Sequence, residues 1–333
     1  MNRRALMTSA WAIAGAAGTG LATGCSRSPS ATTEPLDVLL GESVQPTNPM
    51  VVAERFFADR VAELTEGHCR VTVKPGGELG DEQRMAEMLR TGKLAFSKIL
   101  LANLTAYDKR LGVASLPYAF SGRDQFLDSM RGDFGRRCTA IMAMHGFVLL
   151  AFFYAGDRNF YNRVRPIHTP ADLKGLRIRV PQNIVAIDMI NALGATAVPL
   201  ATNDIGSALQ QRLVDGAENS MVFYTSEQHM RHAPYYSWSR HQQSVDVLLA
   251  SAKWLAERPV PMRDAILEAG RLTQEEELRL WAAATEENAA VAQQQGARLN
   301  DVDVAPFRRA LVNVVSRHRS NFGDLASLLP DAS

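Results

Sequence analysis

The chain has 333 residues, 46% of them hydrophobic and 21% charged, so it is long enough to form two domains and to bury a sizeable core. The formal net charge is +1 and includes Arg3 and Arg4; without the first 25 residues, 34 basic side chains stand against 35 acidic ones and the net charge is −1 with neutral histidines. A nearly neutral chain offers no support for a nucleic-acid partner, because proteins that bind nucleic acid carry a basic surface.

Residues 1–25 are typical of an export signal. Arg3 and Arg4 precede an apolar run rich in Gly and Ala, and the small residues before Cys25 resemble a bacterial lipoprotein cleavage box. Glycines and hydroxyl side chains make this run too weakly hydrophobic for a convincing membrane span. We therefore expect a cleaved signal and a periplasmic protein, with lipidation of Cys25 and the choice between Sec and Tat export left open. Residues 26–35, rich in Ser, Pro and Thr, are expected to form a flexible tether.

The next part of the chain alternates predicted strands with predicted helices. Four apolar segments indicate strands, at 37–42, 70–75, 94–101 and 147–154. Asn48 and Pro49 open a helix that ends before Gly67, because apolar residues recur between them at helical spacing. Further helices are expected at 81–91 and 123–145.

The second half of the chain repeats this design. Strands are predicted at 176–181, 196–200 and 245–251, with a helix at 183–194 and another that ends at 214–216. Thr273 and Glu276 form a capping-box pattern, which predicts a long helix from there to about Gln295. Strand–helix–strand units favour parallel sheets with helices on both faces, so the predicted fold class is α/β.

The order of these elements predicts two α/β lobes. The strand at 245–251 follows the second set of units, so we expect the chain to cross back to the first sheet there. Residues 36–155 and 244–285 would then form one lobe, and residues 156–243 and 286–333 the other. Two crossings of this kind make a hinge.

The two cysteines beyond the signal, Cys69 and Cys138, lack the spacing of metal ligands. An exported compartment permits a disulfide between them. Two buried free thiols are the alternative, because the sequence cannot show whether their Cα atoms lie within bonding range.

Polar residues interrupt the ends of several predicted strands. Arg158 follows an apolar strand, Arg179 lies in the LRIRVP strand, and Asn219 follows VDGAE. In open α/β sheets ligands bind outside the carboxyl ends of the strands, so these side chains can face a cleft between the lobes. Two guanidinium groups can satisfy both oxygens of a carboxylate, and the amide of Asn219 can both donate and accept.

The segment AGDRNFYNRVRPIHTPADLKGLRIRVPQN, residues 155–183, resembles the one that marks the solute receptors of tripartite ATP-independent periplasmic (TRAP) transporters, the DctP-like family. GGELGDEQRMAEMLRTGKL, SLPYAF, GATAVPL and ALQQRLVDGAEN follow in the family's order and spacing. The resemblance implies a two-lobed fold like that of type II periplasmic binding proteins, with hinge strands and a long helix that spans both lobes. It also implies a monomeric receptor that passes a small organic acid to TRAP membrane subunits and does no chemistry itself.

The resemblance also implies roles for particular residues. Arg179 corresponds to the arginine that grips the ligand's carboxylate, Arg158 to a second contact, and Asn219 lies within a matching motif. Lys98, the only charge in LAFSKILLANL, must meet an anion if it is buried, and it matches a basic position of receptors for sugar acids. The remaining candidate ligand-binding residues are Gln182, Tyr224, Glu218, Glu78, Asn48, Glu42 and His241.

Other interpretations stay open at this point. Lys98 can instead pair with a carboxylate such as Glu78, and the spacing of His229 and His232 is more typical of solvated histidines than of a metal site. The chain has no GxSxG, phosphate-binding loop or HExxH motif, and the glycines at 18–24 lie inside the signal, so no cofactor, metal or catalytic residue is expected. The alternatives are a periplasmic enzyme that uses Glu218 or Glu78 with His241, and a structural lipoprotein.

The expected ligand is a sugar acid such as a hexuronate or an aldonate. A C4-dicarboxylate and a keto or aromatic acid are the alternatives. Two departures from the sugar-acid subgroup keep them open: residues 220–223 replace a stretch that often carries a tryptophan, and residues 44–45 stand where a histidine is frequent.

Overall fold

The computed structural model describes residues 34–329, apart from the side chain of Glu286. The predicted export signal, Cys25 and all but the end of the predicted tether lie outside the described residues. Within this described part, none of the helices has the length and apolar character that a membrane span requires.

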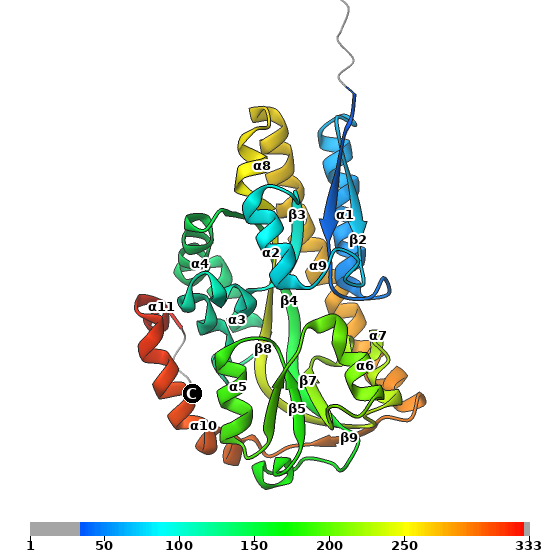
Figure 1. The fold of residues 1–333 in the computed structure, drawn as a ribbon, viewed down its shortest axis with the longest axis vertical. Coiled ribbons are helices and arrows are strands. Elements are labelled where there is room, and N and C mark those ends of the chain that lie inside the picture. The colour runs from blue at the N-terminus through cyan, green and yellow to red at the C-terminus, as the bar shows by residue number, and fades with distance from the viewer. Residues whose placement is uncertain (1–33, 330–333) are drawn as a thin grey trace, which may run out of the picture. The chain divides into compact units, whose positions relative to one another are not determined.

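One mixed sheet of nine strands runs through the described residues (Figure 1). Its strand order is β2-β1-β3-β8-β4-β7-β5-β6, with β9 paired to β8. The strands β1, β2 and β3 are parallel to one another, as are β5, β6 and β7, whereas β8 and β4 run antiparallel to their neighbours in this order. We call the side of β1–β3 the first lobe and the side of β5–β7 the second. The strands are β1 (Leu36–Gly41), β2 (Cys69–Lys74), β3 (Phe96–Leu100), β4 (Phe147–Asn162), β5 (Arg177–Val180), β6 (Thr196–Pro199), β7 (Gly216–Asn219), β8 (Tyr235–Ser251) and β9 (Arg298–Asp301).

The strands β4 and β8 are much longer than the sequence predicted. They pair with each other along most of their length and so connect the two lobes in one sheet. Tyr154 pairs with Val245 and Asp157 with Gln243, so the two residues between them on β4 face the single residue Ser244 on β8. This is a β-bulge, which bends a strand locally. It falls at the two positions where the sequence predicted the hinge, and the hinge itself stays a prediction.

Eleven α-helices accompany this sheet within residues 34–329. They are α1 (Pro49–Leu64), α2 (Glu82–Thr91), α3 (Arg123–Arg131), α4 (Asp133–Met144), α5 (Ile184–Ala192), α6 (Ile205–Gln210), α7 (Met221–Ser226), α8 (Ala252–Ala256), α9 (Val260–Gln294), α10 (Val304–Arg319) and α11 (Asp324–Ser327).

Three predicted helix boundaries are wrong. The helix expected at 123–145 is divided into α3 and α4, because Gly132 adopts an extended backbone and caps both. The long helix α9 begins at Val260, and Thr273 lies inside it with its hydroxyl donating to the carbonyl of Ala269 at 2.7 Å, so the capping box is not formed. The helix α6 ends at Gln210, before the VDG turn.

Each lobe has its own apolar core. One large cluster lies mostly in the first lobe around β1, β3, β4 and β8, and two smaller clusters lie mostly on the second lobe. Phe160 belongs to one of these smaller clusters and Tyr161 to the other, because successive residues of a strand point to opposite faces of the sheet. The second-lobe sheet is therefore covered on both faces.

The end of the chain returns to the first lobe. Phe322, Leu325 and Leu329 pack in the first-lobe cluster, and Asp324 of α11 pairs with Arg137 of α4 at 2.8 Å. The ribbon of α11 accordingly lies beside that of α4 (Figure 1). The sequence placed residues 286–333 wholly in the second lobe; this packing differs from that assignment, and the boundary between the lobes stays a prediction.

The two described cysteines are free. Cys69 begins β2 and Cys138 lies in α4, and both are buried. Burial raises the pKa of the Cys69 thiol to about 11 and that of Cys138 to about 12, so both remain protonated at neutral pH. Of the two alternatives, the structure therefore shows free thiols.

Candidate functional site

A cavity with about 400 Å³ of empty space, part of it open to solvent, lies where the two lobes meet. The carboxyl ends of β3, β5 and β7 reach it, as do the loops after β1 and β6. The middle of β4 and of β8 and single side chains of α1, α2, α7 and α9, among them Glu82 and Trp281, complete the lining. Strand ends of both lobes thus converge on one site, as the topology of an open α/β sheet dictates.

Arg179 is the one guanidinium in this lining without an acidic partner among residues 34–329. It lies on β5 with 1% of its surface exposed, and its Nε and Nη2 donate to the carbonyl oxygen of Leu200 at 3.0 and 2.6 Å. Burial, and then the charge of Arg158, lower its pKa to about 10, so it stays charged at neutral pH. A buried cation without a counter-ion is costly, and an anionic ligand would remove that cost.

Arg158 is buried on β4 and already neutralised. Its Nε and Nη2 bind the two carboxylate oxygens of Glu218, and its Nη1 lies 3.3 Å from both Asn219 Oδ1 and Ser244 Oγ. Burial alone would raise the pKa of Glu218, but the Arg158 charge lowers it to about 2. Arg158 and Glu218 therefore act as a neutral pair. Only Nη1 of Arg158, whose two contacts are long, could give up these contacts and donate to a ligand instead.

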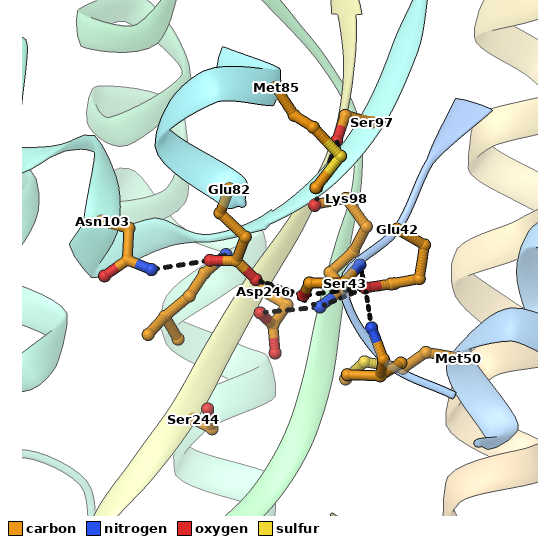
Figure 2. A network of polar contacts seen from close by, with 12 residues as sticks. Glu42, Ser43, Met50, Glu82, Met85, Ser97, Lys98, Asn103, Ser244 and Asp246 are labelled. Atoms are coloured by element: carbon orange, nitrogen blue, oxygen red, sulfur yellow. Dashed lines mark hydrogen bonds and ion pairs between the residues drawn. The ribbon is translucent and has the colours of Figure 1, made fainter. Parts of the chain in front are cut away.

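Lys98 on β3 lies among three carboxylates. Its Nζ is 3.1 Å from Glu42, 3.6 Å from Glu82 and 3.6 Å from Asp246, and Figure 2 shows the side chain pointing into this group. Burial would lower the pKa of Lys98, but the carboxylates of Asp246, Glu42 and Glu82 raise it well above its ordinary value. The alternative that Lys98 pairs with a carboxylate is correct in kind but wrong in partner, because Glu78 is exposed and pairs with Lys74 at 3.5 Å.

Carboxyl groups outnumber cations around Lys98. Glu54 of α1 lies behind Glu42, and burial, followed by the Glu42 charge, raises the pKa of Glu54 well above its ordinary value. A protonated Glu54 can donate to Glu42 Oε2, which has no other partner among the described residues. Burial also raises the pKa of Asp246, to about 6, although Lys98 opposes this shift.

The structure brings five of the predicted site residues into the lining, namely Arg179, Arg158, Asn219, Lys98 and Asn48. The other six lie outside it. Glu42 lies behind Lys98 and Glu218 behind Arg158, and Glu78 is on the surface. Tyr224 donates its hydroxyl to Ala233 O at 2.8 Å, and Gln182 follows β5 with partial exposure. His241 has its Nδ1 at 2.8 Å from Ser239 Oγ and its Nε2 at 3.4 Å from Glu218.

Sequence reasoning missed Glu82, Asp246 and Trp281. Asp246 is the only charge in VDVLLAS, the same signal that singled out Lys98 on the strand paired with it. Leu100 lies opposite Asp246 and Lys98 opposite Leu248, so the two charges are diagonal neighbours on one face. No local signal marks Trp281, which reaches the cavity only through the packing of α9.

Of the two histidines that the sequence indicated as solvated, His232 is partly exposed but His229 is not. His229 is buried with its Nδ1 at 2.9 Å from the Tyr161 hydroxyl, and burial lowers its pKa to about 3. In the part of the chain that the structure describes, no group of His, Cys, Asp and Glu side chains has a geometry that could hold a metal ion.

The acid and base of the enzyme alternative are poorly placed for proton transfer. Glu218 is held ionised by Arg158, and burial lowers the pKa of His241. Both lie behind Arg158 and neither lines the cavity. A general acid or base must reach the atom whose proton it transfers, so this arrangement is suited to binding and not to turnover.

Three hydrogen bonds connect the loop after β1 with the end of α7. The backbone N–H of Gln45 donates to Glu227 at 2.9 Å, Asn48 Nδ2 donates to Ser226 Oγ at 3.1 Å, and the Thr47 hydroxyl donates to Ser226 O at 3.4 Å. Asn48 also caps α1 by accepting from the N–H of Met50 at 3.0 Å. One lobe thus contacts the other beside the cavity.

Comparison with known proteins identifies relatives over nearly the whole described chain. Residues 40–321 match the sequence profile described as bacterial extracellular solute-binding protein, family 7 (DctP). A solute-binding protein of Chromohalobacter salexigens is 30% identical over 305 residues, which is 90% of each chain.

Two solved structures with bound sugar acids have the same fold. A TRAP periplasmic solute-binding protein from a Sulfitobacter species, with bound β-D-galacturonate, superposes with a TM-score of 0.86 at 28% identity, over 88% of this chain and 99% of the other. Another from Chromohalobacter salexigens, with bound D-glucuronate, has a TM-score of 0.85 at 29% identity, over 89% and 98% of the two chains.

Proposed function

The chain belongs to bacterial extracellular solute-binding protein family 7, the periplasmic receptors of TRAP transporters, and we propose that its ligand is a sugar acid, a hexuronate or an aldonate. The protein binds this acid in the cavity between the lobes, releases it unchanged and delivers it to the TRAP membrane subunits. It is a receptor and not an enzyme.

The observation that carries this proposal is the buried guanidinium of Arg179, which has no acidic partner in the described part of the chain. The cavity's other two cations, Arg158 and Lys98, have carboxylate partners, so Arg179 is the group whose charge a ligand must balance. A planar guanidinium offers paired donors to a carboxylate, and burial strengthens the contact. A neutral sugar would leave the cost of burying Arg179 in place.

The remaining lining suits a polyhydroxylated body. Glu82 and Asp246 can accept from hydroxyl groups, Asn219 can donate and accept, and Trp281 offers an aromatic surface to the C–H faces of a sugar. The two related receptors described above hold galacturonate and glucuronate, which combine one carboxylate with several hydroxyls.

Three further expectations extend this proposal to the whole protein. Residues 1–25 are removed on export, the mature receptor acts as a monomer in the periplasm, and Cys25 is its attachment point if it is lipidated. Residues 26–35 would then give the receptor reach from the membrane surface.

A thermal-shift panel tests the proposed function. We expect the signal-free protein to be stabilised by D-galacturonate, D-glucuronate or D-galactonate and not by D-galactose or D-glucose. At a free ligand concentration about 100 times the dissociation constant, binding alone adds about 2.7 kcal/mol to the free energy of unfolding. Stabilisation by the neutral sugars without any by the acids would contradict the proposal, and release of an altered ligand, seen by mass spectrometry, would favour an enzyme.

A further inference from the structure

We propose that Glu82 and Asp246 determine which acids the cavity accepts: they turn the hydroxylated end of the ligand toward the first lobe and exclude acids that carry a carboxylate at both ends. This inference rests on the proposed function, because it takes Arg179 as the site of the first carboxylate.

The charges of the cavity are divided between the two lobes. The second lobe contributes Arg179, which has no acidic partner within residues 34–329, and the neutral pair of Arg158 and Glu218. On the opposite wall the single positive charge of Lys98 faces the carboxyl groups of Glu42, Glu82 and Asp246. The wall around Lys98 is thus acidic on balance, and the wall around Arg179 is basic.

Lys98 is not available to a second carboxylate. An ammonium has three N–H donors, and three carboxylates already lie within 3.1–3.6 Å of Nζ. Two of these carboxylates are fixed in place by other bonds. Glu42 accepts from the N–H of Val44 at 3.0 Å, and Glu82 accepts from Asn103 Nδ2 at 2.6 Å, from the N–H of Leu100 at 3.2 Å and from the Ser43 hydroxyl at 3.0 Å.

Asp246 and Glu82 nevertheless line the cavity, as Glu42 does not, so a ligand meets these two acids directly. In Figure 2 both point toward the Lys98 ammonium, Asp246 from β8 and Glu82 from α2. Apart from its ion pair with Lys98, no bond to another described side chain holds Asp246. Its carboxylate can therefore accept a hydrogen bond from the ligand.

A ligand hydroxyl and a ligand carboxylate differ sharply at this wall. The hydroxyl has a proton to donate to Asp246 or Glu82, whereas an ionised carboxylate has none and meets two like charges in a buried site. An acid with one carboxylate therefore binds in one orientation, with that group at Arg179. A diacid cannot avoid placing its second carboxylate on the acidic wall if its chain spans the cavity.

The test compares two open-chain acids that differ only at the far end, D-galactonate with a hydroxymethyl group and galactarate with a second carboxylate. Calorimetry on the signal-free protein should show galactarate binding about 100-fold or more weakly than galactonate, because buried like charges cost several kcal/mol. Glu82→Gln and Asp246→Asn should each reduce the ratio of the two dissociation constants, galactarate to galactonate, at least about tenfold. Glu87→Gln is the matched control, since it makes the same change on the exposed face of α2 and should leave the ratio unchanged.

The outcomes separate this inference from the proposed function. Equal affinities of the wild-type protein for the two acids, or an unchanged ratio in both cavity variants, overturn the inference while leaving the receptor's function standing. If no sugar acid binds, the proposed function fails first. The comparison of galactonate with galactarate on the wild-type protein needs no substitution. It can therefore refute the inference even if a variant does not fold.

Discussion

At the scale of single residues, three buried cations in one cavity have different roles because they have different partners. Lys98 lies among three carboxylates and Arg158 is bound by Glu218, so both charges are balanced within the protein. Within residues 34–329, Arg179 donates only to the carbonyl of Leu200, and a carbonyl carries no net charge. A ligand anion therefore gains more binding free energy by balancing the charge of Arg179 than by approaching either of the other two cations.

We expect Arg179→Ala to remove most of the affinity for a sugar acid. Losing one partner of a buried, hydrogen-bonded ion pair costs on the order of 2–5 kcal/mol, which corresponds to roughly 30-fold to several-thousand-fold in affinity. Arg179→Lys should restore only part of it, because the paired donors are lost. Calorimetry measures both variants.

The matched control for this prediction lies two residues away on the same strand. Arg177 is exposed and pairs with Asp215 at 3.0 Å, outside the cavity lining. Arg177→Ala should bind the acid like the wild-type protein. Tight binding by Arg179→Ala, or an equal loss in both variants, would reject Arg179 as the anchor.

At the scale of elements, the bulge between β4 and β8 lies where the two lobes connect, and residues of the bulge also line the cavity. Gly156 has a φ of 78°, a left-handed conformation that side chains rarely adopt, and an added Cβ would lie 3.0 Å from Trp281 Nε1. The bulge therefore requires a glycine both for its backbone and for the close approach of α9. We therefore expect the position of Trp281 in the cavity to depend on this contact.

We expect Gly156→Ala to destabilise the protein by about 1–3 kcal/mol through backbone strain, with a further loss from displacement of Trp281. Gly175→Ala is the control, because Gly175 has nearly the same φ, 79°, and a Cβ there meets nothing within 4 Å. Denaturant unfolding should show the larger loss at Gly156, and calorimetry should show weaker binding at Gly156 alone. Equal losses at the two glycines would mean that the contact with Trp281 does not matter.

At the scale of the whole described molecule, the loop after β1 contacts α7 through bonds that can form only when the lobes are together. Ser226 accepts from Asn48 and Thr47, and Glu227 accepts from Gln45. A ligand that touches both lobes would stabilise this arrangement, because it would bind a closed state better than an open one.

We expect ligand binding to reduce the radius of gyration measured by small-angle scattering. Ser226→Ala should weaken binding by about 2- to 10-fold, since it removes one hydrogen bond between the lobes worth about 0.5–1.5 kcal/mol. Ser207→Ala is the control, because the Ser207 hydroxyl bonds to Asp204 O within the second lobe. An unchanged radius with saturating ligand would argue against closure about the bulge.

The sequence by itself determined the α/β alternation and the strand ends that carry Arg179 and Asn219, because apolar periodicity and strand-end polarity are local properties of the chain. The family followed from the resemblance of its motifs, which are also read locally. The lengths of β4 and β8 and the start of α9 were decided by pairing and packing with distant segments. The same holds for the balance of charge in the cavity. Lys98 meets acids from β8, from α2 and from the loop after β1, and only the tertiary structure brings these groups together. The sequence could therefore name the cations of the site, but which of them lacks a counter-ion depends on contacts that no local pattern records.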